Sequence, residues 1–528
     1  MAMIVRAGLL ALLAGTTGAV AQAQTTDNQE LQRKIDALQQ QLDELRAQVR
    51  SGSAGQGAPA AAAPAPAGAA AAAAPADAKA VSWPTPIERK PGDGFTLLTR
   101  GGELSIYGVL DLSADTASKG LNGLTANNVG PAGNPGWMED ISSNISYIGV
   151  RGFQSLGNFP ARFVYQLETQ VDVSASSGTS GSNSNTSDVV KGGLTSRNSF
   201  IGLASPTWGA LKIGKTDAPY KNSTASMNPF GGMWGDYAVV MGNSGGDNRV
   251  EFGARLDHSI WYESPTIAGA NFNLLISPGQ NRGEDSSNLA AGEVDCTGGN
   301  IPGSGATPQA CNDGSFGTAY SASLGWRGGP LYVTAAYELH SKVNRTSDLP
   351  TWDAGDIANE SAAKIGAQYA FPTGTTVSGI FEYLKRDVPG RLAYQNERQR
   401  NGFWLAASQR ITDQDSVHVG WAHAGRTPGD PGQHNTPGGA HQDNVANMFT
   451  VALKHQVDKN FQVYADFAET LNHFAAHYDI GAGGRSVTTD CHDASNPDTT
   501  GFDPNGNAPH CWAGGHLKGA SIGARYTY

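Results

Sequence analysis

From Gly101 to the end of the chain, hydrophobic and polar residues alternate in stretches of about ten residues. In FQVYADFAET (461–470), phenylalanine, valine and alanine alternate with Gln462 and Asp466. The last stretch, KGASIGARYTY, puts Tyr528 and Ile522 on one face and Arg525 on the other. A period of two predicts β-strands whose neighbouring side chains point to opposite faces.

The polar face of most of these stretches carries charges of both signs, which a packed soluble core does not tolerate. One isolated stretch would also fit an edge strand of a soluble sandwich, but the whole set fits a barrel with lipid outside and water inside. We therefore predict an all-β protein, a 16-stranded antiparallel transmembrane β-barrel over residues 102–528 with short periplasmic turns and long external loops. The strands are expected to start near Glu103, Asn144, Ala161, Ser196, Gly209, His258, Ala270, Thr318, Leu331, Ala362, Thr375, Gly402, Asp415, Asn444, Asn460 and Leu517.

The first residues have the features of a removed secretory signal. Arg6 precedes the apolar run Ala7–Val20, and AVAQAQ supplies small residues for cleavage after Ala21 or Ala23. A short membrane anchor is the alternative, although the apolar run is shorter than the roughly 20 residues a spanning helix needs. We predict a signal peptide over residues 1–23.

Residues 24–50 contain a heptad pattern, which predicts a short periplasmic coiled-coil helix. A lone amphipathic helix packed on its own domain is the alternative. The seam consists of Leu31, Ile35, Leu38, Leu42, Leu45 and Val49. From Ser51 the composition changes to alanine, glycine and proline, so residues 51–101 are expected to be a linker.

The composition excludes several classes of function. The 528 residues carry a formal net charge of −11 with no basic cluster, which argues against a nucleic-acid partner. Four cysteines fit an oxidising compartment, and their spacing favours the local disulfides Cys296–Cys311 and Cys491–Cys511. A zinc site built from all four is the alternative, but no close CxxC pair is present. We expect neither a metal nor a cofactor.

Several segments resemble the Gram-negative trimeric outer-membrane porins, especially the general porins of β-proteobacterial type. They are LSIYGVLDLSAD (104–115), SYIGVRGFQSLGN (146–158), FVYQLET (163–169), SRNSFIGLASPTWGALKIGK (196–215) and RLDHSIWYESP (255–265). The resemblance implies a homotrimer in the outer membrane, passive transport of ions and small hydrophilic solutes, and no enzymatic activity. It also implies that residues 217–257 fold into the lumen as a constriction.

The candidate pore-lining and constriction residues come from the polar strand faces and from this loop. They are Tyr147, Arg151, Arg162, Arg197, Lys212, Lys215, Asp236, Asp247, Arg249, Glu251, Arg255 and Trp261. Each charge could equally be an ordinary wall or loop residue. The family usually has basic residues at the positions of Tyr147 and Trp261, so these two suggest an aromatic surface for sugar rings or aromatic solutes. The alternative is ordinary aromatic packing.

Three interpretations of function remain open. A general diffusion pore is the leading one, and a substrate-selective porin for sugars, phosphate or organic acids is its alternative within the class. The N-terminal helix and linker also fit a structural tether that contacts the cell wall. A barrel enzyme lacks support, because GNSGG (242–246) does not have the strand–helix setting of a serine nucleophile.

Overall fold

The computed structural model describes residues 87–89, 95–118, 137–171, 173–174, 197–242, 252–278, 316–344, 357–387, 399–427, 445–473, 476, 478–480 and 516–528. The predicted signal peptide, the coiled-coil seam, the four cysteines, Asp247, Arg249 and Glu251 lie outside these residues.

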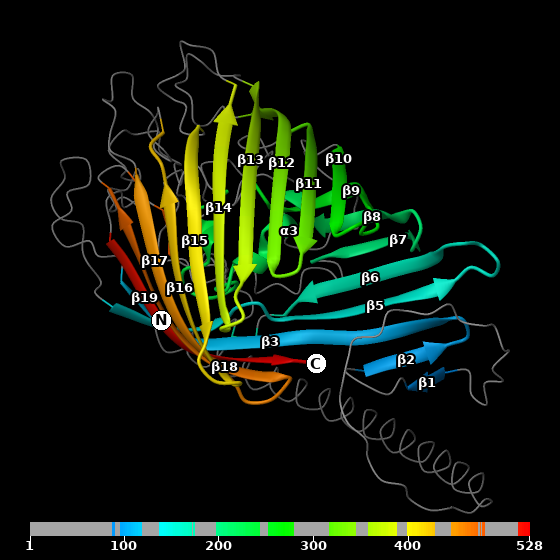
Figure 1. Ribbon diagram of the computed structural model, residues 1–528, viewed down its shortest axis with the longest axis horizontal. Coiled ribbons are helices and arrows are strands. Elements are labelled where there is room, and N and C mark those ends of the chain that lie inside the picture. The colour runs from blue at the N-terminus through cyan, green and yellow to red at the C-terminus, as the bar shows by residue number, and fades with distance from the viewer. Residues whose placement is uncertain are drawn as a thin grey trace, which may run out of the picture. The chain divides into compact units, whose positions relative to one another are not determined.

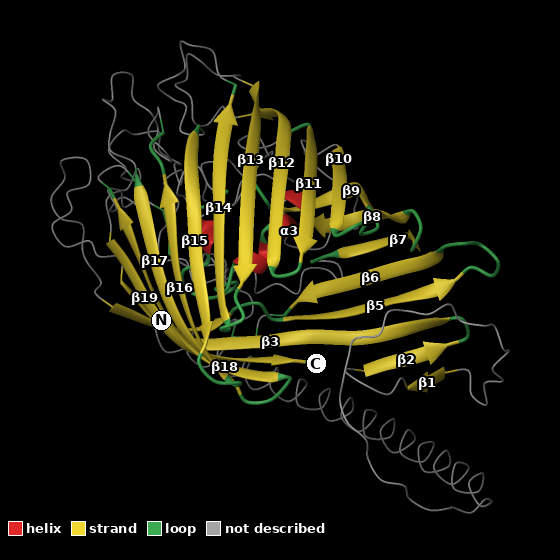
Figure 2. Ribbon diagram, viewed as in Figure 1, coloured by secondary structure: helices red, strands yellow, loops and turns green. Residues whose placement is uncertain are grey.

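Sixteen antiparallel strands form a closed barrel, as the alternation predicts (Figures 1 and 2). The expected starts agree with the observed ones to within five residues, the largest difference being Ala362 against Ile357. The strands are β3 (Gly102–Ser118), β5 (Tyr147–Ser155), β6 (Arg162–Gln170), β7 (Ser199–Ser205), β8 (Gly209–Asp217), β9 (Arg255–Glu263), β10 (Ala270–Pro278), β11 (Thr318–Gly328), β12 (Leu331–Asn344), β13 (Ile357–Ala370), β14 (Thr375–Arg386), β15 (Arg400–Arg410), β16 (Asp415–Ala424), β17 (Ala446–Gln456), β18 (Phe461–Asn472) and β19 (His516–Thr527).

The last strand closes the barrel against the first. β19 pairs with β3 from Lys518 opposite Ser118 to Thr527 opposite Val109. Tyr528 extends the ladder, since its N–H and carbonyl each bond to Gly108 at 3.1 Å. Closure removes the unpaired edge that an open sheet would leave in lipid.

Three short strands were not predicted. β4 (Trp137–Ser143) pairs with the second half of β3, and β5 pairs with its first half. β4 and β5 therefore act as one interrupted wall strand. β2 (Phe95–Thr99) pairs with the first residues of β3, and β1 (Ile87–Arg89) pairs with β2. This β1–β2 hairpin lies within the range expected to be linker.

The two faces of the wall have the polarity expected for a barrel in lipid. On the outer face Ile365, Leu453 and Ile522 are 61%, 56% and 71% exposed. Their neighbours Lys364 and Ser521 point the other way and are buried. This is the reverse of a soluble domain, in which large apolar side chains are mostly inside.

Helical structure is confined, among the described residues, to the connection between β8 and β9. It comprises α3 (Pro219–Ser223) and the 3-10 turns η1 (Ala225–Met227) and η2 (Tyr237–Val239). None of the described helices has the length and apolar character needed to span a bilayer.

The polarity of the faces gives a first prediction. Replacing Ile365 with lysine puts a charge on the lipid face in the middle of β13, and we expect it to destabilise the barrel by about 2–4 kcal/mol. The control Thr376→Lys places the same charge on the inner face of β14, near the β13–β14 turn, where the side chain faces the aqueous lumen and we expect a smaller cost. Unfolding of both variants by urea in lipid vesicles measures the difference. Equal costs at the two positions would contradict the assignment of the faces.

Candidate functional site

Residues 218–242, called the 218–242 segment below, pack against the inner face of the strands from β10 to β19. Helix α3 contacts β10, β11 and β12. Further along, Met227 and Phe230 are fully buried in a cluster with Trp404 and Ala422 of the wall. The wall makes room for them with small inward residues on β15 to β17, namely Gly402, Ala406, Gly420, Ala422, Ala424, Ala446 and Ala452.

Glu382 on β14 holds both ends of the 218–242 segment. Its carboxylate accepts a hydrogen bond from the Tyr220 hydroxyl at 2.6 Å and another from the Gly242 N–H at 2.7 Å. Burial and the nearby Glu382 carboxylate raise the pKa of Tyr220 well above its usual value, so the phenol keeps its proton and donates. Arg400 lies 3.8 Å from the same carboxylate and balances its charge.

The backbone carbonyls of the segment also need partners, because little of it is helical and none is in a sheet. The wall supplies them. Tyr332 donates to the Ser223 carbonyl at 2.9 Å, and the Trp404 indole donates to Met227 at 2.9 Å. Three cationic side chains also donate to backbone carbonyls of the segment. They are Lys454 to the Pro229 carbonyl, Arg400 to the Val240 carbonyl and Arg525 to the Gly231 carbonyl. The segment is thus attached to the wall from β12 to β19.

Asp236 was expected to contribute charge to a constriction, but its carboxylate is occupied within the 218–242 segment. It is only 8% exposed and caps η2 by accepting from the Ala238 N–H at 3.0 Å. It also accepts from the Asn228 amide at 2.8 Å and the Gly232 N–H at 3.2 Å. Asp236 therefore stabilises a turn.

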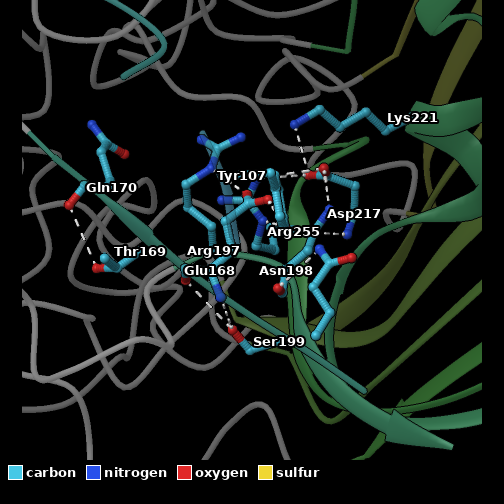
Figure 3. Close-up of polar contacts among 11 residues, drawn as sticks. Tyr107, Glu168, Thr169, Gln170, Arg197, Asn198, Ser199, Asp217, Lys221 and Arg255 are labelled. Carbon is cyan, nitrogen blue, oxygen red and sulfur yellow. Dashed lines mark hydrogen bonds and ion pairs between the residues drawn. The ribbon is translucent and has the colours of Figure 1, made fainter. Parts of the chain in front are cut away.

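The wall from β3 to β9 carries a connected set of charged and aromatic side chains (Figure 3). Glu168 on β6 binds the Arg197 guanidinium at 2.6 Å and accepts from the Tyr107 hydroxyl at 3.0 Å. The Arg197 guanidinium also lies 4.6 Å from the centre of the Tyr147 ring. The Arg197 backbone N–H donates to the Glu168 carbonyl, which fixes the start of β7 beside β6.

A second cluster of charges lies where β8 and β9 begin to diverge, and Figure 3 shows it beside the first. The Asp217 carboxylate forms ion pairs with Lys221 at 2.9 Å and with Arg255 at 3.3 Å. Asn198 joins them, donating to Asp217 at 3.1 Å and accepting from Arg255 at 2.7 Å. Two cations thus share one carboxylate.

The structure separates the two aromatic candidates. Trp261 is 3% exposed, packs edge-on against Phe200 at 5.3 Å and donates its indole N–H to Glu263 at 2.8 Å. Glu263 in turn binds Lys212 at 2.7 Å. Because Trp261 is covered, it does not form an exposed aromatic surface together with Tyr147.

The remaining candidates lie on the same wall. Arg151 and Arg162 are exposed, and Lys215 lies on β8 opposite Ser199, three residues after Lys212. Sequence reasoning did not single out Tyr107, Glu168, Asp217 or Glu382. For Tyr107, Glu168 and Glu382 the available signal was inward parity in the alternation, which does not distinguish them from other polar wall residues. Asp217 has the parity of the outward Ile213, and the register shifts between Gly214 and Thr216 before it.

Comparisons with known proteins agree with this architecture. A family model described as Gram-negative porin matches residues 58–474. An outer membrane porin protein of Bordetella pertussis is 25% identical over 341 residues, covering 61% of this chain and 76% of the relative. The solved anion-selective porin from Comamonas acidovorans has a similar fold, with a TM-score of 0.53 and 16% identity. The match covers 81% of this chain and all of that one.

A closed barrel with an apolar exterior and a polar lumen, together with these matches, identifies the protein as an outer-membrane channel for passive diffusion. Solutes in such a channel are selected by the width and charge of a wet path. The family match spans most of the sequence. The chain belongs to the Gram-negative porin family.

Proposed function

We propose that this channel is narrowed by the 218–242 segment, which leaves solutes a path along the wall from β3 to β9. The observation that carries the proposal is the position of Glu382, which bonds to Tyr220 near the start of the segment and to Gly242 at its end. The segment is thereby held across the lumen side of β10 to β19. It reaches the opposite wall at Ala117 of β3, beside Trp234, and at Ile145, beside Gly232.

The charges along the open wall favour anions. Arg151 and Arg162 are exposed, and in the described residues neither has a carboxylate in ion-pair contact. Two cations share Asp217, whereas Arg197 and Lys212 are each balanced by one carboxylate. The positive charge of Arg151 and Arg162 raises the local anion concentration beside β5 and β6 in a narrow lumen.

A homotrimer, as the resemblance to the general porins implies, is part of the same proposal. Native mass spectrometry of the detergent-extracted protein tests it. A single species of three chains supports the trimer, and monomers alone would contradict it.

Single-channel recording in a planar bilayer, with a potassium chloride gradient across it, tests the anion preference. We expect a reversal potential of the sign given by chloride permeation. In Arg151→Gln/Arg162→Gln we expect it to shift toward zero, whereas Arg327→Gln on the β11 wall should shift it less. A cation-selective parent channel would refute the preference.

The hydrogen bonds from Tyr220 and Gly242 to Glu382 give a further prediction. In Glu382→Ala the Tyr220 hydroxyl, the Gly242 N–H and Arg400 lose their shared partner. We expect a loss of about 3 kcal/mol in unfolding free energy, because breaking a buried ion pair is costly. We also expect larger and noisier single-channel currents, because the segment is released.

Glu263→Ala is the matched control for this variant. It removes a wall carboxylate that binds Lys212 and Trp261 and touches no residue of the 218–242 segment. We expect its current noise to match that of the parent. A Glu382→Ala channel with parental conductance and noise would show that the segment does not set the width of the path.

A further inference from the structure

Three residues of the connection from β18 to β19 are fully buried inside the barrel. They are Tyr478, Asp479 and Ile480, called the 478–480 stretch below, and each is 0% exposed. Connections between strands usually run over the surface of a protein, and this one is among the long external connections. The burial of the 478–480 stretch therefore indicates a role inside the channel.

Two inward side chains of β18 hold the 478–480 stretch in place. The Asn472 side chain accepts from the Tyr478 N–H at 2.8 Å and donates to the Tyr478 carbonyl at 2.9 Å. The Thr470 hydroxyl donates to the Asp479 carbonyl at 3.0 Å. Because Asn472 and Thr470 are themselves buried, these hydrogen bonds lie in a medium of low dielectric, where they are stronger than in water.

Ile480 meets the middle of the 218–242 segment directly. Its carbonyl accepts from the Gly235 N–H at 2.8 Å. Its side chain belongs to the same buried cluster as Trp234. The other members of this cluster come from the wall and are Ala117 of β3, Ala468 of β18 and Leu517 of β19. Trp234 is thus enclosed by three wall strands together with Ile480.

Gly235 is held on two sides at this contact. Its φ of 74° lies in the left-handed region, and a Cβ atom there would overlap the Thr450 side chain of β17. Thr450 also donates to the Gly235 carbonyl at 3.4 Å. The turn at Gly235 therefore lies between the wall on one side and Ile480 on the other.

Tyr478 acts on the end of the 218–242 segment through Arg400. The Arg400 guanidinium lies 5.7 Å from the centre of the Tyr478 ring, within the roughly 6 Å over which a cation is attracted to a ring face. Arg400 in turn donates to the Val240 carbonyl and lies 3.8 Å from Glu382. The 478–480 stretch thus supports the middle of the segment directly and its end indirectly.

We propose that Tyr478 and Ile480 are positioning residues of the channel, which hold the 218–242 segment in place from an external connection. The inference rests on the proposed function, in which this segment narrows the lumen, and it adds a second support to that given by Glu382. Loss of the second support releases the segment and widens the path. The width of the channel then depends on the connection from β18 to β19 as well as on the wall.

Reaction of an introduced cysteine beneath the segment tests this inference during bilayer recording. Ala452 on β17 is 1% exposed in the same cluster as Phe230, and it is roughly 20 Å along the strand from Ala446, the partner of Asn472. We expect Ala452→Cys to react very slowly with a bulky water-soluble thiol reagent. In Ala452→Cys/Asn472→Ala we expect loss of current roughly tenfold faster, because two buried hydrogen bonds to Tyr478 are removed.

A second pair of variants changes the contact with the segment itself. Ile480→Ala removes most of the side chain that packs with Trp234, so we expect it to accelerate the reaction at Ala452→Cys as Asn472→Ala does. Ile480→Val keeps most of that side chain and should leave the reaction slow. Only conducting channels are scored, so a variant that does not fold does not enter the measurement.

Asn447→Ala is the matched control. It removes an amide at the external end of the neighbouring strand β17, and this amide bonds to Trp421 and His423 on the outer face. We expect the reaction at Ala452→Cys to stay as slow in this variant as in the channel with the cysteine alone. The parent protein with its four cysteines is the reference for the reagent.

The outcomes separate this inference from the proposed function. Slow reaction in both Asn472→Ala and Ile480→Ala, while Glu382→Ala makes Ala452→Cys reactive, would overturn the positioning role. Equal acceleration by Asn447→Ala would overturn it as well. If Glu382→Ala leaves both the reaction and the conductance at their parental values, the proposed function fails instead, because the segment does not set the width of the path.

Discussion

The rest of this structure depends on the closure of β19 against β3, because no strand edge survives unpaired in lipid. Side chains on the inner face reinforce the backbone ladder at this seam. Arg525 of β19 binds the fully buried Asp111 of β3 at 2.6 Å and 2.8 Å. Tyr464 of β18 donates to the other oxygen of Asp111 at 2.8 Å. Residues 414 positions apart are thus joined by one ion pair whose burial makes its loss costly.

The same seam also positions the contents of the lumen. Arg525 reaches the Gly231 carbonyl, so the group that closes the barrel also holds the 218–242 segment. Asn144, in the break between β4 and β5, donates to Tyr464 at 2.9 Å and to Ser113 at 3.0 Å. Closure of the wall, the interruption of its second strand and attachment of the segment therefore rest on one buried polar network.

The sequence allowed the wall to be predicted because its signal is local. A period of two between lipid and water assigns each residue of a strand to a face, so Gln462, Asp466 and Arg525 were placed on the polar side from neighbours alone. The contacts inside the lumen join residues that are far apart in the sequence. Glu382 meets Tyr220 across 162 positions, and no pattern in either segment indicates the pair. Asp236 was expected in the pore, yet its own turn contains the N–H groups from which its carboxylate accepts.

We propose that solutes pass beside β5 and β6 while the 218–242 segment fills the side of β10 to β19. Reaction of an introduced cysteine with a bulky water-soluble thiol reagent during bilayer recording tests this path, with the parent protein and its four cysteines as reference. Arg151→Cys should react and lose most of its current. Ala422 is fully buried beneath the segment, so the current through the Ala422→Cys channel should stay unchanged after addition of the reagent. Rapid block at Ala422→Cys with none at Arg151→Cys would place the path beside β15 to β17 and refute a path along β5 and β6.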